Sequence, residues 1–360
     1  MPANTINGLA LDRVYSTTLQ AVRDSVAMEI VQSNPLMWHM YRQGAVRYEG
    51  GTECRMPVVL TESSNVSAIG TYATFATTPE DGPDTARYPT WYKNRASVVV
   101  DNTELAQNRG AYQIVNLLNA KMAIAKISLI NELSRQLFTA QAGNELAGLP
   151  DFICRTSVSA TPNLTVGGIA QSGVAGGYAN WNNQAAQMTA FGTDGLDVWE
   201  QLYMDASKKS THPDIILTDP QVYRFFKRLV APNQAERDKA LWDQGFQNLL
   251  FEGTPVVPEE QLAGTGHTYM LTTTGKRQVN DFNLKPEHFS TPGKNPMVQG
   301  KATGVGLQLA ILEHDDFRMT DFMTPPNSDV IIAHTYFTAM LTASSLARQA
   351  VSEFSGAIQF

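Results

Sequence analysis

Hydrophobic positions recur at helical spacing in two long stretches of the chain. The first stretch ends at Asn34-Pro35, because proline disfavours helix at the residue before it. The second stretch, residues 103–140, has no proline and one glycine, and it is predicted to form one helix of roughly 55 Å. The apolar stripe of the first predicted helix is Leu11, Tyr15, Leu19, Val22, Val26 and Ile30. That of the second is Ile114, Leu118, Met122, Ala125, Leu129, Leu133 and Leu137.

Four more apolar residues widen the stripe of the long helix. A helix that is apolar beyond one stripe is expected to pack on more than one side. The four residues are Leu117, Ile124, Ile127 and Ile130.

A polar excursion lies between two strand-like runs ahead of the long helix. Residues 56–60 and 88–100 are rich in β-branched or aromatic residues, as strands are. Residues 61–85 between them are rich in Thr and Ser and end in a group of acids. A structureless loop of this length is uncommon in a compact domain, and an isolated hairpin is marginal in water. We therefore predict a two-stranded arm that reaches toward a supporting partner surface.

The rest of the chain alternates short strands and helices. Residues 150–195 are rich in Gly, Ala, Asn, Ser and Thr and are predicted to be a loop-rich connection. Thr218-Asp219-Pro220 is a strong helix start, because Thr or Asp caps a helix and proline suits its first turn. A helix is predicted over 194–209, and strands over 214–217, 249–257, 268–273, 307–313 and 329–341.

Composition narrows the class of protein. The chain has 360 residues, 43% hydrophobic and 17% charged, with a net charge of −7. It contains no Lys/Arg run of the kind that grips nucleic acid, so we expect no specific nucleic-acid binding. Cys54 and Cys154 fit no zinc or redox spacing and are expected to be free thiols. We find no secretory signal and no apolar run long enough to span a membrane.

Short motifs do not assemble into a catalytic site. Glu313-His314-Asp315-Asp316 has the chemistry of metal ligands, but it is a single run without a second cluster at a defined spacing. Gly304-Val305-Gly306 lacks the third glycine of a dinucleotide fingerprint, and Gly275-Lys276 lacks the upstream glycine of a phosphate loop. We therefore predict no catalytic residue, no metal site and no cofactor.

The order of elements resembles the major capsid protein of tailed bacteriophages, with the Hong Kong 97-like fold. The resemblance covers most of the chain and rests on organisation. Its residues are Ser33-Asn34-Pro35-Leu36, Tyr48-Glu49-Gly50-Gly51, the loop 61–85, the helix 103–140, Ile216-Leu217-Thr218-Asp219-Pro220 with Tyr223, Phe251-Glu252-Gly253-Thr254-Pro255-Val256-Val257, and Tyr269-Met270-Leu271.

The resemblance implies an α+β fold in four parts. Residues 1–40 would be an N-terminal arm, and residues 55–98 an extended β-hairpin, the E-loop, that lies over a neighbouring subunit. A peripheral domain with a spine helix at about 103–140 would comprise 41–54, 99–194 and 313–342. An α/β axial domain would comprise 195–312 and 343–360.

The implied function is that of a shell protein rather than an enzyme. Copies of the chain would assemble into hexamers and pentamers of an icosahedral shell around double-stranded DNA. Assembly would take place in the host cytoplasm, and the mature protein would reside in the virion. Further implied partners are a portal protein and a decoration or cement protein. A separate scaffolding protein is expected, because only 33 residues precede Asn34.

Residues of the arm are the candidates for contact between subunits. Aromatic side chains offer large apolar area at low entropy cost, and acidic ones pair with Lys or Arg of a neighbour. The aromatic candidates are Tyr72, Phe75, Tyr88, Trp91 and Tyr92, and the acidic ones are Glu80, Asp81 and Asp84. Lys93 is the only lysine of the arm and lies near its base, so we expect no covalent cross-link through the arm.

Two alternative functions remain open from the sequence. An encapsulin, a bacterial nanocompartment shell, shares the fold and would differ in its cargo and its small uniform size. An oligomeric enzyme with a β-arm for dimerisation predicts a discrete small oligomer in solution.

Overall fold

The structure is a computed structural model that describes residues 34–61, 68, 84–103, 111–208, 211–230, 238–273, 306–312, 317–326 and 328–360. Side chains at 111–120 and at 126 are not among the described parts. The predicted N-terminal helix and the Glu313–Asp316 run lie outside the described residues, as do residues 104–110 of the predicted long helix.

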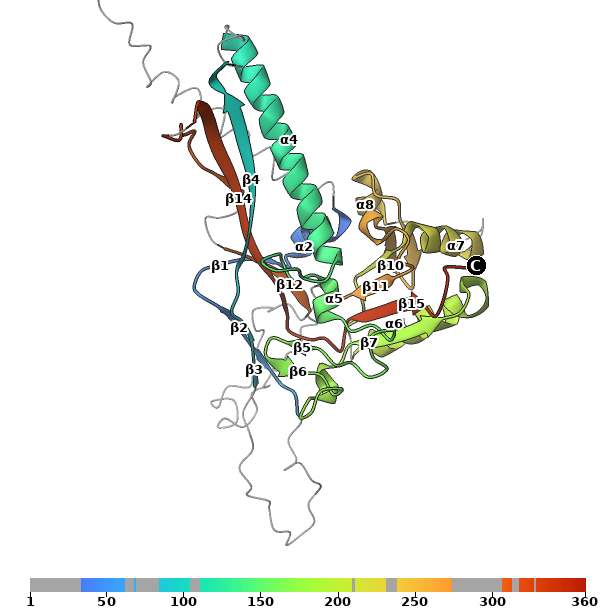
Figure 1. The fold of residues 1–360 in the computed structure, drawn as a ribbon. Helices are drawn as coiled ribbons and strands as arrows, with labels where there is room; N and C mark the ends of the chain where they lie inside the picture. Colours follow the sequence, from blue (N-terminus) through green and yellow to red (C-terminus); the bar gives the residue numbers. More distant parts are fainter. Residues whose placement is uncertain are drawn as a thin grey trace, which may run out of the picture.

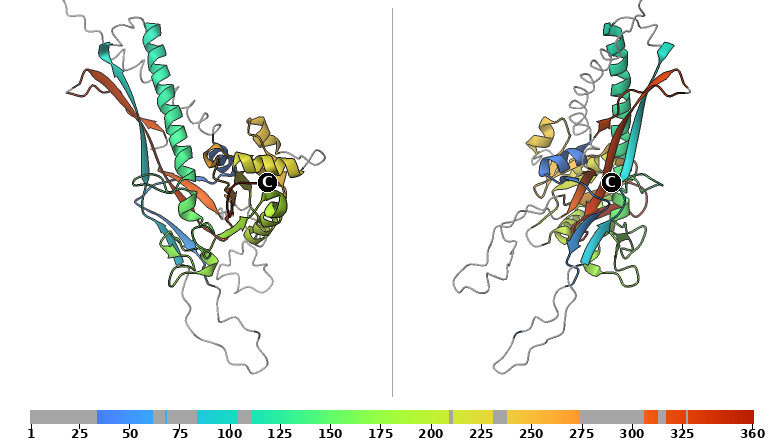
Figure 2. Two further views of the ribbon diagram at one scale, coloured as in Figure 1. Left: turned by 45° about the vertical axis from the view of Figure 1, so that its right-hand side comes forward. Right: turned by 90° about the vertical axis from the view of Figure 1, so that its left-hand side faces the viewer.

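A long helix beside a long strand pair forms one elongated half of the molecule. Helix α4 (Ala111–Phe138) runs along β4 (Tyr92–Asp101) and β14 (Val330–Ala343) in every view (Figures 1 and 2). The two strands are antiparallel and pair along all of β4, from Tyr92 opposite Ala339 to Asp101 opposite Val330. The described helix ends within two residues of the predicted end.

Strands from both ends of the chain complete this sheet. β12 (Leu307–Leu312) and β13 (Arg318–Met319) pair with β14, and β1 (Val46–Glu49) pairs with β12 in parallel. The sheet thus has five strands among the described residues, and α4 covers one of its faces. Val98 and Val100 of β4 pack on Met122 of α4.

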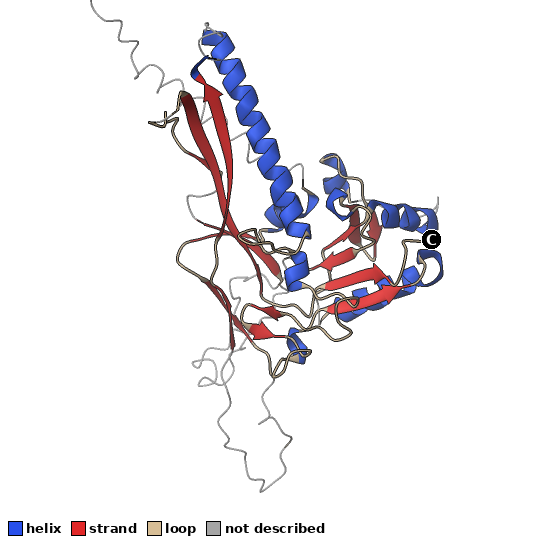
Figure 3. Ribbon diagram, in the orientation of Figure 1, coloured by secondary structure: helices blue, strands red, loops and turns tan. Residues whose placement is uncertain are grey.

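A second sheet, of six strands, forms the α/β half of the molecule (Figure 3). Its order is β7 (Gln184–Met188), β15 (Ala350–Phe354), β11 (Thr268–Leu271), β8 (Ile215–Thr218), β10 (Thr254–Pro258) and β9 (Leu249–Phe251). Alternate residues of β8 serve two cores. Ile216 packs with α6 (Leu196–Ala206) and α7 (Pro220–Val230), whereas Ile215 and Leu217 face the junction with the elongated half.

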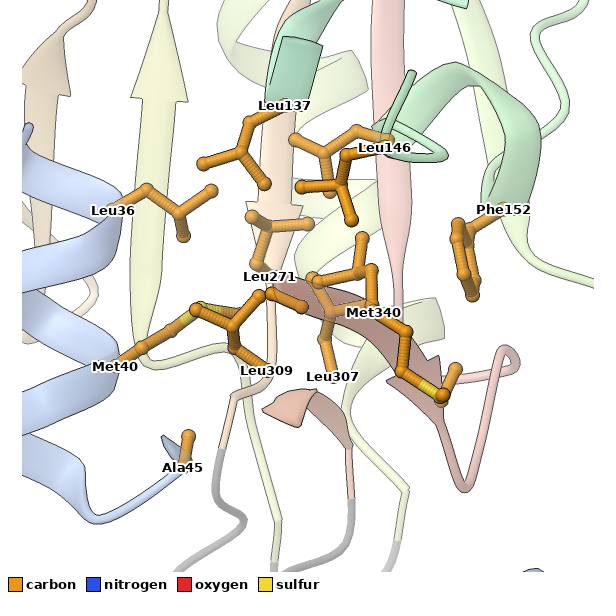
Figure 4. Packing of buried hydrophobic residues seen from close by; sticks show 14 of the residues in the cluster. Leu36, Met40, Ala45, Leu137, Leu146, Phe152, Leu271, Leu307, Leu309 and Met340 are labelled. Carbon is orange, nitrogen blue, oxygen red and sulfur yellow. The ribbon is translucent and has the colours of Figure 1, made fainter. Parts of the chain in front are cut away.

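One continuous core joins the two halves. It takes Leu36 and Met40 from α2 (Pro35–Gln43), Leu137 from the end of α4, and residues of both sheets (Figure 4). Leu271 belongs to the six-stranded sheet, whereas Leu307, Leu309 and Met340 belong to the five-stranded one. Short elements fill the joint: α5 (Leu149–Phe152), η1 (Ala179–Trp181), η2 (Phe191–Gly195), α8 (Lys239–Asp243) and η3 (Glu260–Leu262).

Local signals explain two helix starts. Asp219 accepts a hydrogen bond from the Gln221 N–H at 2.7 Å ahead of α7, which confirms the predicted start. Asn34-Pro35, predicted only as a helix stop, begins α2: Asn34 accepts from the Met37 N–H at 3.0 Å and Pro35 fills the first position. The prediction was incomplete because the same dipeptide that ends one helix suits the start of another.

The predicted strand 249–257 is a hairpin. Glu252 and Gly253 have positive φ angles of 47° and 77° and form the turn between β9 and β10. The glycine accommodates this backbone, and the chain therefore reverses there instead of continuing.

Strand pairing differs from the predicted domain limits at three places. β7 joins the six-stranded sheet although 184–188 were assigned to the peripheral domain. β12 joins the five-stranded sheet although 307–312 were assigned to the axial domain. Residues 92–98, assigned to the arm, pair with β14. In each case the partner strand lies at least 28 residues away in sequence, so local patterns carry no trace of the pairing.

Candidate inter-subunit surface

The base of the predicted arm is a short antiparallel ladder. β2 (Cys54–Val58) pairs with β3 (Asp84–Tyr88), and Cys54 is opposite Tyr88 while Val58 is opposite Asp84. Side chains alternate along β2, with Cys54, Met56 and Val58 buried and the two between them exposed. The two paired strands are 54–58 and 84–88, whereas the predicted flanks were 56–60 and 88–100. Most of the predicted second flank forms β4 and pairs with β14 instead.

The rest of the subunit braces this ladder. The Arg87 N–H donates to the Gly167 carbonyl at 2.8 Å, in the hairpin of β5 (Thr165–Val166) and β6 (Ile169–Ala170). Gly167 has φ +61° and lies so close that a Cβ there would meet that of Ala86 at 3.0 Å. The Asn180 side-chain amide donates to the Leu60 carbonyl at 2.7 Å. The β2–β3 ladder is thus fixed to the body of the subunit.

Four predicted contact residues, Tyr72, Phe75, Glu80 and Asp81, lie outside the described residues. A fifth, Asp84, is the first residue of β3 and its side chain is exposed. An exposed carboxylate at the outer end of the ladder is available to a neighbouring molecule.

Tyr88 is buried inside its own subunit, whereas a residue that contacts another subunit must be exposed. It is 8% exposed, and its hydroxyl donates to the Ala343 carbonyl at 2.8 Å and accepts from the Ala343 N–H at 3.1 Å. Burial raises its pKa well above the ordinary tyrosine value. The pleat of β3 turns Ala86 and Tyr88 inward, so Tyr88 stabilises its own subunit.

Trp91 and Tyr92 are half-buried and pack against the central core. The Trp91 indole N–H donates to the Gly51 carbonyl at 3.0 Å, which fastens the turn after β1. Their apolar area is therefore partly used inside the subunit.

The middle of α4 carries an exposed apolar surface. Ile124 and Ile127 are 64% and 49% exposed, whereas Ile130 is buried. A groove of about 550 Å³ runs between α4 and β4, and Ile124, Lys121 and Glu132 line it on the helix side. Within the widened apolar stripe, Ile130 is therefore part of the core, whereas Ile124 and Ile127 remain exposed.

A cluster of charged side chains stabilises the C-terminal end of α4. Arg135 Nη2 lies 2.6 Å from carboxylate oxygens of both Glu132 and Glu145. The hydrogen bonds from Arg135 lower the pKa of Glu132. Sequence patterns show the Glu132–Arg135 spacing, but the approach of Glu145 depends on the turn after the helix.

One polar cluster has the residue types of a hydrolase site. Ser157 Oγ donates to Glu353 at 2.7 Å, and His267 Nε2 lies 3.9 Å from the same carboxylate and 2.9 Å from Arg155 Nη1. Nucleophilic catalysis needs a base in contact with the hydroxyl and a third group behind the base. Here the hydroxyl faces the carboxylate, and burial lowers the pKa of His267. The geometry is that of a structural clamp on the 154–159 loop.

Within the described ranges no group of three His, Cys, Asp or Glu side chains is arranged to hold a metal ion. Cys54 and Cys154 are free and buried, as expected. In the same part of the chain, every helix is too short or too polar to cross a membrane.

The chain matches solved structures, whereas two other comparisons find no match. No protein-family model matches the chain, and no curated protein matches it. The capsid of cyanophage A-1(L) matches with a TM-score of 0.58 and 13% identity, covering 86% of this chain and 90% of that one. The capsid of the Myoviridae phage XM1 matches with a TM-score of 0.51 and 13% identity, over 88% and 91%. The chain has the fold of phage capsid proteins.

One further match has a lower score. An encapsulin complex from Synechococcus elongatus matches with a TM-score of 0.45 and 13% identity, covering 86% of this chain and 84% of that one. That score is too low to support an argument. These similarities show the fold. The β2–β3 ladder and the exposed side of α4 are the candidate contact surfaces of the chain.

Proposed function

We propose that this chain is the major capsid protein of a tailed double-stranded DNA bacteriophage. The observation that carries the proposal is the fold shared with phage capsids over 86% of the chain at a TM-score of 0.58. Copies of the chain assemble into hexamers and pentamers of an icosahedral shell that encloses the genome. Its place is the virion, after assembly in the host cytoplasm.

In this role the chain has four working parts with the Hong Kong 97-like arrangement. Residues 1–40 are an N-terminal arm, α4 is the spine helix of the peripheral domain, and the six-stranded sheet is the core of the axial domain. The excursion between β2 and β3 is the E-loop, which lies over a neighbouring subunit. The braced ladder at its base supports this assignment, because a fixed base lets an extended arm transmit a contact to its own subunit.

The proposed partners follow from shell assembly. They are further copies of the chain, a scaffolding protein, a portal protein, and a decoration or cement protein. The chain has no catalytic role in this proposal, in keeping with the clamp geometry of Ser157, Glu353 and His267.

Electron microscopy of the purified, expressed chain tests the proposal directly. Shells several hundred Å across, or hexamers and pentamers together, are expected. A stable dimer with no larger assembly contradicts the capsid function and favours an enzyme with a dimerisation arm. Small uniform shells that copurify with a protein cargo favour an encapsulin.

Replacing residues 62–83 by Asn-Gly tests the role of the arm. This change keeps β2, β3 and the bracing contacts of Arg87 and Asn180, so the subunit is expected to fold. Stable shells are expected to disappear while circular dichroism and the unfolding midpoint stay near those of the unmodified chain. Normal shells from the shortened chain contradict the assigned role.

A further inference from the structure

The side of α4 that meets α2 continues as an exposed surface toward the N-terminus of α4. Asn34, which caps α2, donates through its side-chain amide to Ser134 Oγ of α4 at 2.8 Å, and both residues are buried. Residues seven apart in a helix share one side, because seven residues make nearly two turns. Ile127 is therefore on the same side as Ser134, yet it is 49% exposed. Ala123, one turn further on, is exposed as well.

The other exposed isoleucine of α4 belongs to a different surface. Ile124 lines the groove between α4 and β4, whereas Ile127 is not among the described residues that line it. Ile127 and Ala123 thus form a separate exposed surface, the Ile127 face, directly beyond the contact between Asn34 and Ser134.

The segment that precedes Asn34 requires an apolar surface. Residues 11–30 carry an apolar stripe at helical spacing, and Val22, Val26 and Ile30 are its last three members. A single helix of this length is marginal in water and gains most of its stability by packing its apolar side. The segment is joined to the body at Asn34, beside Ser134 of α4.

The link from this segment to α4 has the right length. From Ile30 to Asn34 an extended chain spans at most about 14 Å. The step from Ser134 to Ile127 is about 10 Å along the helix axis. Ile30 can therefore lie level with Ile127. Residue numbers fall in both segments with distance from the Asn34–Ser134 contact, so a helix over 11–30 would run parallel to α4.

We propose that residues 11–30 pack as a helix on the Ile127 face of their own chain, parallel to α4. In this arrangement Val26 and Ile30 contact Ile127 and Ala123. The small side chain of Ala123 lets the two helices approach to the usual interaxial distance of about 8–10 Å. The inference goes beyond the proposed function, because it concerns the fold of one subunit.

The covalent link favours the segment of the same chain over that of a second copy. A segment joined by a short linker beside its binding surface has an effective concentration in the millimolar range. The same segment of a second copy has only the concentration of the protein. Val22, Val26 and Ile30 are thus matched with the exposed surface that lies next to their own attachment point.

Cysteine pairs in the full chain test the contact. Ile127→Cys is combined with Val26→Cys in one variant and with Ile30→Cys in another. Facing positions of packed helices bring Cα atoms into the range of a disulfide, about 4.4–6.8 Å. At least one pair is expected to form a disulfide within one chain after mild oxidation. The closed loop is expected to migrate faster on a non-reducing denaturing gel.

Met28→Cys with Ile127→Cys is the matched control. Met28 lies two residues beyond Val26, which places it on the opposite side of a helix, so no disulfide is expected. Cys54 and Cys154 are 5% and 3% exposed and are not expected to react.

Proteolysis of the full chain provides a second measurement. Trypsin cleaves after Arg23 when the segment opens, and the cleavage rate follows the open fraction. Ile127→Asp places a charge against Val26 and Ile30, and it is expected to raise this rate about tenfold. Ile124→Asp, at the exposed isoleucine of the groove, is expected to change the rate less than about twofold. Mass spectrometry of the fragments measures both rates.

Each outcome decides the inference. A disulfide within one chain at Val26 or Ile30 but not at Met28, with faster cleavage in the Ile127→Asp chain, supports the packing. A disulfide-linked dimer assigns the Ile127 face to the segment of a second copy and overturns the contact within one chain. No disulfide from either pair, an equal yield at Met28, or cleavage after Arg23 that ignores Ile127→Asp overturns the packing. The proposed function is judged by shell formation, so either can fail while the other stands.

Discussion

At the residue scale, one buried carboxylate, that of Glu259, sets how the stability of the subunit depends on pH. Glu259 is 5% exposed, caps η3, and has one carboxylate oxygen without a hydrogen-bond partner among the described residues. Burial raises its pKa from the ordinary 4.5 to about 7. The folded state therefore holds a proton that the unfolded chain releases between these values, and stability falls as pH rises through this window.

Glu259→Gln is expected to remove this pH dependence. The unmodified chain should lose up to about 3 kcal/mol of unfolding free energy between pH 4.5 and 7, at 1.36 kcal/mol per pKa unit. Urea unfolding at several pH values measures the slope, with exposed Glu260→Gln as the control. A slope that is equal in both variants and the unmodified chain would rule out Glu259 as its source.

At the scale of elements, one side chain ties α2 to α4. Asn34 caps α2 through its side-chain oxygen, and its amide donates to Ser134 Oγ of α4 at 2.8 Å. Asn34→Ala is expected to cost about 1–3 kcal/mol, because it removes a cap and leaves a buried hydroxyl without this donor. Asn34→Asp keeps the cap oxygen and separates the two contributions. Equal unfolding midpoints for all three chains would contradict this assignment.

Sequence patterns predicted elements better than their partners. The stripe of α4 and the Asp219-Pro220 start of α7 follow from local spacing, and both are present. β7 is a run of Gln and Ala without a strand pattern, and its pairing with β15 is a contact across 166 residues. Tyr88 points inward because of the register of β3. The order of aromatic residues along the chain does not determine that register, so it does not show which of them are buried. The sequence places the exposed isoleucines of α4 in an apolar stripe. Their exposure could not be predicted, because it depends on which part of the helix the sheet covers.

The whole molecule behaves as one body because a single core joins its halves. Leu271 is fully buried where the six-stranded sheet meets α2 and the five-stranded sheet (Figure 4). Leu271→Ala is expected to cost about 2–5 kcal/mol and to weaken both halves together, giving a single unfolding transition at lower urea. Ile124→Ala, at an exposed position, is expected to change stability by less than about 0.5 kcal/mol. Two separate transitions in the Leu271 variant would show that the halves unfold independently.

The place of β15 has a consequence for the timing of synthesis. This strand, residues 350–354, lies between β7 and β11, so the six-stranded sheet is split until it is inserted. Pairings over such sequence distances form slowly, and they wait for β15 to leave the ribosome. A chain truncated before residue 350 therefore lacks the completed sheet. Synthesis through residue 354 is therefore the step that joins β7 to the rest of the sheet.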